Sequence, residues 1–360
     1  MNTFFLDRLN SEPHALAFAG QSTPWPVALA DQSANPALDE ALHTHAAAAQ
    51  ALLYPVSAEL LATTGRPVDL FGFEPNPARL GAAAAASASV PGIALTQLGA
   101  LLDAAALGYN PAQAKPVAVL GHSQGVLAVH MVQAICEAGS IDAAAAKIDE
   151  ILAIATLIGV AGTRQARQLG LAARHGEATP MLSVKDITRA QVDALIKRVS
   201  GARGPIAVAV TNSATHYVLS GYPEDLAAFG VEVAKEHKHQ AKLREEKVRG
   251  GRVFEPVLEY LDVTLPFHSP LMAEAVSQAV SWAESCGINA DHARELAAEV
   301  LLNHVDWAAR VRALMKSTDP SALWVLDFGP GTTVWQAVSP PLPKAPASAW
   351  WKPPPWPIAA

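Results

Sequence analysis

The stretch from Pro116 to Val129 constrains the fold of this chain more than any other. It opens with four apolar residues, Val117 to Leu120, which predict a short buried strand, and Val126 to Ile135 has the apolar spacing of a helix. Between them lies Gly121-His-Ser-Gln-Gly125, a Gly-x-Ser-x-Gly pentapeptide. Strand, tight turn and helix in this order are the context in which such a pentapeptide forms a nucleophile elbow.

The predicted elbow gives Ser123 the position of a nucleophile. Glycines flank the serine because a strained turn and a closely packed helix leave no room for a Cβ atom. The start of a helix also favours negative charge that develops during a reaction. The alternative is a glycine-bounded turn with an idle serine, and the strand and helix around it favour the catalytic interpretation.

A serine nucleophile needs a base, and among the 12 histidines His268 stands apart. It follows an apolar segment that we expect to form a strand near Leu261 to Leu265. Pro266 and Pro270 restrict the backbone on either side. We therefore expect a rigid, solvent-reachable imidazole that acts as general base. A histidine that only caps a strand is the alternative, and the elbow makes it the weaker one.

Composition narrows the class of protein. The chain has 360 residues, of which 51% are hydrophobic, enough for one large domain or two unequal ones. No apolar run reaches the length of a membrane span, and the first residues lack the pattern of a signal peptide, so we expect a cytoplasmic enzyme with no membrane partner. The net charge of −7 argues against nucleic acid. Cys136 and Cys286 form neither a disulfide framework nor a metal-ligand pattern, so we expect no metal site.

Six segments spread along the chain carry a family resemblance. In chain order they are Ala17-Phe-Ala-Gly-Gln-Ser-Thr-Pro-Trp25, Gly121-His-Ser-Gln-Gly125, Thr211-Asn-Ser-Ala-Thr-His-Tyr-Val-Leu-Ser-Gly221, Val248-Arg-Gly-Gly-Arg-Val-Phe254, Pro266-Phe-His-Ser-Pro-Leu-Met272 and Leu326-Asp-Phe-Gly-Pro-Gly331. They resemble the motifs of acyl-carrier-protein transacylases, in the malonyl-CoA:ACP transacylase-like superfamily. The nearest likeness is to the acetyltransferase (starter-loading) domain of bacterial and fungal type I fatty acid synthases.

The resemblance implies a set of site residues. Ser123 would be the nucleophile and His268 the base, and the backbone N–H groups of Gln21 and Gln124 would form the oxyanion hole. A main-chain carbonyl, which we align at Val300, would orient the histidine. The substrate pocket would include His122, Val160, Ala161, Asn212 and Phe267. No cofactor is bound in such enzymes: a coenzyme A thioester is the substrate, and the acceptor is the phosphopantetheine thiol of an acyl carrier protein.

Substrate choice depends on a missing arginine. Malonyl-specific relatives carry an arginine on the helix after the elbow, where it pairs with the free carboxylate. The matching stretch here, Leu157 to Gly162, has no cationic residue. An unpaired buried carboxylate would cost several kcal/mol, so we expect an acetyltransferase that primes fatty acid synthesis. The alternatives are a malonyl- or palmitoyl-type transacylase, a serine thioesterase or esterase, and a non-catalytic docking domain.

The expected partners are an acyl carrier protein and other domains of a fatty acid synthase. An acidic carrier would need a locally basic surface on a chain of net charge −7. The segment Lys235 to Arg252 is a dense mix of Lys, Arg, His and Glu. Lys247, Arg249 and Arg252 there are candidates for a contact with the phosphopantetheine carrier or the coenzyme A phosphates; the alternative is a solvated helix and loop, as such charge runs usually are.

The order of elements predicts an α/β fold with an inserted unit. Residues 180–236 read as β-α-β-β-α, and with the strand near 261–265 they predict a ferredoxin-like subdomain over residues 178–265. Residues 1–177 and 266–340 would form an α/β hydrolase-like body. Residues 341–360 are proline-rich, and we expect neither strand nor helix there. Our hypothesis for this tail is a frame-shifted end of a longer synthase; a natural proline-rich linker is the alternative.

Overall fold

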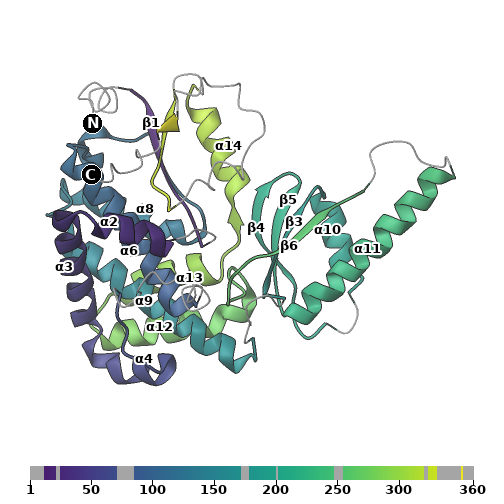
Figure 1. Cartoon of the computed structure of the whole chain (residues 1–360), viewed down its shortest axis with the longest axis horizontal. Helices are drawn as coiled ribbons and strands as arrows, with labels where there is room; N and C mark the ends of the chain where they lie inside the picture. The colour runs from purple at the N-terminus through teal and green to yellow at the C-terminus, as the bar shows by residue number, and fades with distance from the viewer. Residues whose placement is uncertain are drawn as a thin grey trace.

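Two packed units make up the computed structural model (Figure 1). The structure describes residues 12–21, 25–70, 85–171, 178–199, 202–246, 254–319, 323–330 and 350–351. The larger unit has a parallel sheet among helices, and the smaller has a mainly antiparallel sheet with two helices. The predicted class, an α/β body with an inserted ferredoxin-like unit, is confirmed.

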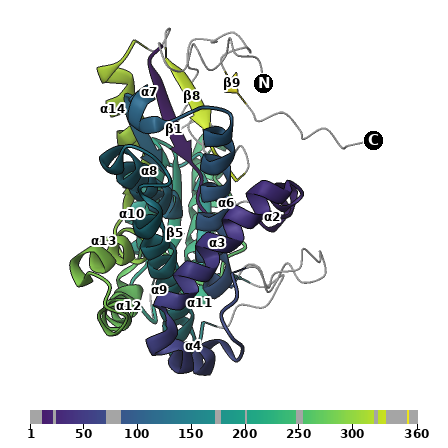
Figure 2. The same cartoon turned by 90° about the vertical axis from the view of Figure 1, so that its left-hand side faces the viewer.

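The body is built on the strand order β2-β1-β8-β9. Its strands are β1 (His14–Phe18), β2 (Ala118–Gly121), β8 (Trp324–Asp327) and β9 (Trp350–Trp351). All pairings are parallel, and every residue of β1 is buried because helices lie on both sides of the sheet (Figure 2). Phe18 at the end of β1 lies in register with Gly121 at the end of β2. The carboxyl ends of the two strands therefore meet where the elbow begins.

Helices and short 3₁₀ turns surround this sheet. In chain order they are α2 (Trp25–Ser33), α3 (Pro36–Leu52), η1 (Tyr54–Val56), α4 (Ser57–Thr64), α6 (Ala86–Ala106), α7 (Pro111–Ala114), η3 (Ser123–Gly125), α8 (Val126–Ala138), α9 (Ala145–Gln168), η4 (Pro270–Met272), α12 (Ala273–Ser285), α13 (Ala290–Leu301) and α14 (Trp307–Ser317). Among them α6 is long and apolar enough to match a membrane span, contrary to our expectation. Its apolar window is 78% buried inside the protein, as in the core helix of a globular domain.

The small unit has the strand order β6-β3-β5-β4-β7. Its elements are β3 (Met181–Lys185), α10 (Arg189–Ile196), β4 (Ala207–Ser213), β5 (His216–Ser220), α11 (Pro223–Glu245), β6 (Val257–Tyr260) and β7 (Val305–Asp306). Side chains alternate along its strands: Leu219 joins a core with α10 and α11, whereas its neighbour Val218 joins the core of the body. The sheet therefore has one face toward its own helices and the other toward the body.

Four expectations about elements were wrong. The closing strand is β6, not residues 261–265, and α11 continues to Glu245 rather than ending at 236. The small sheet also takes in β7, outside the predicted range, because Val210 and Thr211 pair with this segment of the body. In the tail, Trp350–Trp351 forms a strand on β8, since this dipeptide is free of proline and can hydrogen-bond at a sheet edge. The rest of residues 341–360 lies outside the described residues.

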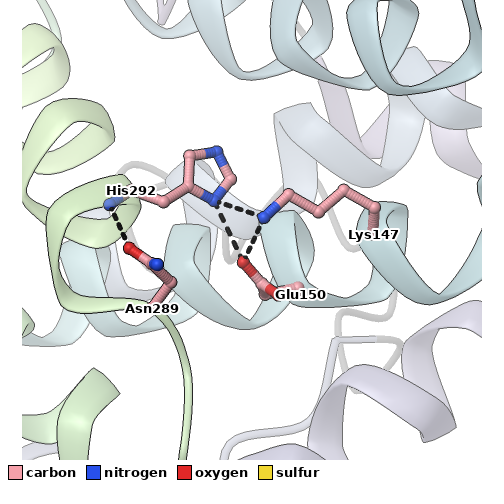
Figure 3. A network of polar contacts seen from close by, with 4 residues as sticks. All are labelled: Lys147, Glu150, Asn289 and His292. Atoms are coloured by element: carbon pink, nitrogen blue, oxygen red, sulfur yellow. Dashed lines mark hydrogen bonds and ion pairs between the residues drawn. The ribbon is translucent and has the colours of Figure 1, made fainter. Parts of the chain in front are cut away.

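A polar network ties α9 to α13 (Figure 3). Lys147 Nζ lies 2.6 Å from Glu150 Oε1, and His292 Nδ1 lies 3.0 Å from the same oxygen. Burial alone would raise the pKa of Glu150, but the hydrogen bonds from Lys147 and His292 lower it below its usual value. Asn289 caps α13 by accepting from the His292 amide at 2.9 Å. These contacts join α9 to α13.

Steric contact at the elbow explains its two glycines. A Cβ atom at Gly125 would lie 2.4 Å from the Phe18 carbonyl oxygen, and one at Gly121 would lie 2.5 Å from the Gly125 carbonyl carbon. Both neighbours are backbone atoms, which cannot move without displacing β1 or the elbow itself. Gly125 has an ordinary helical φ of −58°, so crowding alone excludes a side chain there.

Gly125→Ala should therefore destabilise the protein by about 1–3 kcal/mol, the usual result of overpacking. Urea unfolding followed by circular dichroism measures this change. The matched control is Gly230→Ala in helix α11, because a Cβ atom at this position would meet only Leu258 Cδ1, at 3.6 Å. That control should be neutral or stabilising by up to about 1 kcal/mol. Equal stability of wild type and Gly125→Ala would contradict the steric explanation.

Candidate active site

The structure brings Ser123 and His268 together although 145 residues separate them. Ser123 Oγ lies 2.7 Å from His268 Nε2, and His268 Nδ1 lies 2.8 Å from the carbonyl oxygen of Asn303. A carbonyl oxygen can only accept, so Nδ1 carries the proton and Nε2 accepts from the serine hydroxyl. This tautomer lets His268 take the serine proton during attack.

The carbonyl that orients the histidine is that of Asn303, so our alignment at Val300 was wrong. Val300 is fully buried within α13, which ends at Leu301. At and after the last helical residue, the backbone carbonyls have no partner within the helix and can accept from other groups. The Leu301 carbonyl accepts from the Ser269 amide at 3.1 Å, and the Asn303 carbonyl accepts from His268. The end of the apolar helix was the signal in the sequence that could have identified Asn303, which lies three residues after Val300.

Both members of the pair sit on strained backbone. Ser123 has φ +54° and His268 has φ +56°, values in the left-handed region that residues other than glycine rarely adopt. Such conformations persist where the surrounding packing fixes them, as at a nucleophile elbow. His268 is only 2% exposed, not solvent-reachable as we expected, because Phe267 and the segment after α13 enclose the turn that carries it.

The two glutamines predicted for the oxyanion hole lie side by side. The Gln124 side-chain amide donates to Gln21 Oε1, and the Gln21 amide donates to Ser89 Oγ at 2.6 Å. Gln124 is the second residue of η3, where backbone N–H groups lack an intrahelical partner. Gly20 lets the Gln21 loop come this close, since a Cβ there would lie 2.9 Å from Ser123 Cβ.

His122 and Asn212 join the body to the small unit. His122 Nε2 lies 2.9 Å from Asn212 Oδ1, and the Asn212 amide lies 3.4 Å from His216 Nε2. His216 in turn lies 3.1 Å from Ser183 Oγ on β3. A chain of polar contacts therefore runs from the elbow across three strands of the small sheet. Sequence reasoning included the first two residues and missed the last two.

Three other predicted pocket residues occupy apolar surroundings. Val160 and Ala161 are buried in α9, which packs closely against α6. Phe267 is 2% exposed and its ring centroid lies 6.4 Å from that of His268. No cluster of three or more His, Cys, Asp or Glu that could hold a metal occurs in the part of the chain that the structure describes.

Two residues of α14 near the elbow were also missed. The Trp307 ring meets that of His122 edge-on at 5.3 Å between centroids, and Arg310 Nη1 donates to the Gly121 carbonyl at 2.8 Å. Both follow the Asn303-His-Val-Asp segment, and their separation by three residues places them on one helix face. No sequence pattern marked them, because only the fold brings α14 to the end of β2.

Burial keeps the histidines of this cluster neutral. It lowers the pKa of His268 to about 3, against a smaller opposite effect of the Asn303 carbonyl, and the charges of His122, His304 and Arg310 lower it further. Burial likewise lowers the pKa of His216 to about 4 and that of His122 below its usual value. A neutral His268 is ready to accept a proton over the whole neutral range.

These lowered pKa values predict that the protein loses stability as the solution is acidified. Below about pH 6.5 the unfolded chain binds protons that the folded histidines do not, so the unfolding free energy falls as pH drops toward the folded pKa values. Above about pH 6.5 this contribution to the unfolding free energy is fully retained. Melting temperature measured from pH 4.5 to 8 tests this, and His216→Gln should flatten the acid slope. His43→Gln on exposed α3 is the control, and an unchanged slope in His216→Gln would refute the contribution of His216.

Comparison with known sequences connects this geometry to a family. Residues 180–260 match the family model described as the fatty acid synthase central AT domain. The chain is 26% identical over 287 residues to the fatty acid synthase beta subunit TOXC of Cochliobolus carbonum, covering 68% of this chain and 13% of that protein. It is also 26% identical over 169 residues to the beta subunit hexB of Dothistroma septosporum, covering 43% of this chain and 9% of that protein. The chain thus spans a small part of these relatives.

Solved structures share the fold over nearly the whole chain. The Mycobacterium tuberculosis protein titled MCAT aligns with a TM-score of 0.57 at 19% identity, covering 90% of this chain and 92% of that one. The malonyl CoA-acyl carrier protein transacylase of Clostridium perfringens aligns with a TM-score of 0.56 at 16% identity, covering 91% and 89%. The expected resemblance is confirmed: this chain has the fold of the malonyl-CoA:acyl carrier protein transacylases, and its residues 180–260 match the central AT domain family of fatty acid synthases.

Proposed function

We propose that this chain is an acyltransferase that moves a short acyl group, preferably acetyl, from coenzyme A to an acyl carrier protein. The observation that carries the proposal is the pair Ser123–His268, with 2.7 Å between Oγ and Nε2 and the Nδ1 proton held by the Asn303 carbonyl. This arrangement activates a serine for nucleophilic attack. The match of residues 180–260 to a fatty acid synthase family directs the activity toward fatty acid synthesis.

The reaction has two halves that use the same groups. His268 Nε2 takes the Ser123 proton as Oγ bonds to the thioester carbonyl carbon; the C–S bond then breaks, and the proton passes to the departing coenzyme A thiolate. The phosphopantetheine thiol of the carrier next loses its proton to His268 and its sulfur bonds to the acyl carbon of the acyl-serine ester. The ester C–O bond then breaks, and His268 passes the proton to Ser123 Oγ. In both halves the backbone N–H groups of Gln21 and Gln124 stabilise the negative oxygen.

The preference for acetyl rests on the apolar character of α9. Val160 and Ala161 are buried there, and the two arginines that follow point elsewhere: Arg164 donates to Gln278 at 2.9 Å, and Arg167 donates to the Thr63 carbonyl. A malonyl carboxylate next to this part of α9 would lack a cationic partner. The second candidate is a malonyl transacylase, favoured by the solved malonyl CoA-acyl carrier protein transacylases that share the fold.

A carbonyl partner for the catalytic histidine favours transfer over hydrolysis. Serine esterases and thioesterases of the α/β-hydrolase type orient their histidine with a carboxylate, whereas His268 Nδ1 is bound to the Asn303 carbonyl. A transferase also needs an acceptor. One solved structure of this fold is titled as a type II polyketide synthase acyl-carrier protein in complex with its malonyl-transacylase. Release of coenzyme A that depends on added carrier supports transfer, and carrier-independent release supports hydrolysis.

The remaining parts of the proposal concern context. Coenzyme A thioester and carrier-bound phosphopantetheine are substrates, and we propose no bound cofactor. Because the matched relatives are fatty acid synthase beta subunits several times longer than this chain, other synthase domains are the proposed structural partners. We propose a cytoplasmic location, where coenzyme A thioesters and carrier proteins meet.

The roles of Ser123 and His268 predict different defects. Ser123→Ala should form no acyl-enzyme, and His268→Ala should form it about 10²–10⁴-fold more slowly, as expected for a lost general base. Intact-protein mass spectrometry after incubation with acetyl coenzyme A measures both. The mass of the Ser123→Ala variant is the control for labelling at other sites. Acyl labelling of Ser123→Ala at the wild-type rate would place the nucleophile elsewhere.

Donor preference distinguishes the two transacylase candidates. Wild-type protein incubated with equal amounts of acetyl and malonyl coenzyme A should carry mostly acetyl, because the matching stretch of α9 offers no cation. An arginine placed by Val160→Arg or Ala161→Arg should shift the ratio toward malonyl, by up to about tenfold or more for a charge-assisted pair. The wild-type ratio decides the question. Malonyl loading at or above the acetyl rate would favour the malonyl transacylase.

A further inference from the structure

One peptide group at the start of the elbow is held by hydrogen bonds on both sides. The amide between Gly121 and His122 donates its N–H to the Phe18 carbonyl at 2.9 Å, and its C=O accepts from Arg310 Nη1 at 2.8 Å. In a trans peptide the N–H and C=O groups point in opposite directions. Arg310 therefore approaches from the side away from β1, at the edge of the described sheet. His122, whose N–H belongs to this peptide group, directly precedes Ser123.

Arg310 carries its charge into the site without an acidic partner. Within the part of the chain that the structure describes, no carboxylate lies within ion-pair distance of its guanidinium, and its hydrogen bond is to Gly121. The side chain is partly buried and reaches from α14 to the Gly121 carbonyl, two residues before Ser123. Its charge acts on both His122 and His268. A partly buried, unpaired guanidinium is unusual unless a neighbouring group makes use of it.

We propose that Arg310 is a positioning residue for the acyl transfer: it clamps the peptide group that leads into the elbow and sets a positive charge beside the Ser123–His268 pair. The inference rests on the proposed function. Without the clamp, the C=O of Gly121 would lose a charge-assisted hydrogen bond at an open sheet edge, and the strained turn at Ser123 would gain freedom.

The charge has a second consequence for the reaction. Removing a cation near His268 makes its protonated, inactive form easier to reach, so the rate should begin to fall at a higher pH. The other charged and titratable groups around the pair are His122, His304 and His216. Arg189 and Asp306 lie beside His304, and Lys185 and Glu259 lie beside His216. None of them is changed by a substitution at Arg310.

The test compares Arg310→Met, Arg310→Lys and the control Arg312→Met, which alters an exposed arginine of the same helix. Single-turnover acylation by acetyl and malonyl coenzyme A is followed by mass spectrometry from about pH 2.5 to 9, a range that reaches below the His268 pKa of about 3. Circular dichroism at each pH verifies folding. Arg310→Met should slow acylation by about tenfold or more with either donor. Its acid limb should move upward by about half a pH unit or more. Arg310→Lys should retain the wild-type acid limb but only part of the rate, and the control should match wild type.

Each other result overturns the inference. An unchanged acid limb in Arg310→Met would reduce Arg310 to a structural contact. Loss confined to the malonyl donor would make it the partner of a substrate carboxylate instead. If Arg310→Met does not fold, Arg310→Lys decides, and a wild-type rate in that variant refutes the clamp. Wild-type protein that forms no acyl-enzyme would refute the proposed function. Wild-type protein that forms the acyl-enzyme at the same rate as Arg310→Met would refute only the role of Arg310.

Discussion

The close approach of β1 to the elbow is the constraint on which the rest of the site depends. Carbonyl oxygens at the end of β1 come so near Gly125 that a single carbon atom there would lie 2.4 Å from one of them. This close approach leaves room only for glycine at the turn, where Ser123 has a φ of +54° and its hydroxyl lies 2.7 Å from His268 Nε2. The start of α8 and the Gln21 loop are then fixed relative to the serine, because both continue from the same crowded backbone.

The small unit is part of the candidate active site, although its own core is separate. Asn212 on β4 binds His122 of the elbow, and the neighbouring Thr211 pairs with Asp306 of β7. Only His304 lies between β7 and Asn303, whose carbonyl holds His268. A displacement of the small sheet would therefore move both histidines. The insertion of the subdomain between the serine and the histidine in sequence thus has a physical counterpart in how the pair is held.

The electrostatics of the site favour a neutral base and a positive surrounding. Burial lowers the pKa of His268, and the nearby charges act in the same direction. No carboxylate binds the imidazole in the described structure; the Asn303 carbonyl fixes the tautomer instead. A carbonyl stabilises the imidazolium less than a carboxylate would. In the proposed acyl transfer, the backbone donors near Ser123 would therefore carry more of the stabilisation of the transition state. Such a site is suited to activated thioesters, whose carbonyl is more reactive than that of an amide.

The sequence by itself determined the local chemistry of this protein. The pentapeptide around Ser123, the prolines around His268 and the β-α-β-β-α pattern after residue 180 predict the elbow, the candidate base and the inserted unit, because each is encoded by neighbouring residues. The tertiary structure decided what depends on distant segments: that Asn303 rather than Val300 supplies the carbonyl, that β7 joins the small sheet, and that His268 is buried. It also decided the place of Arg310, since a hydrogen bond across 189 residues leaves no periodicity in the sequence. Any residue can offer a carbonyl, and only the path of the backbone selects which one reaches the histidine.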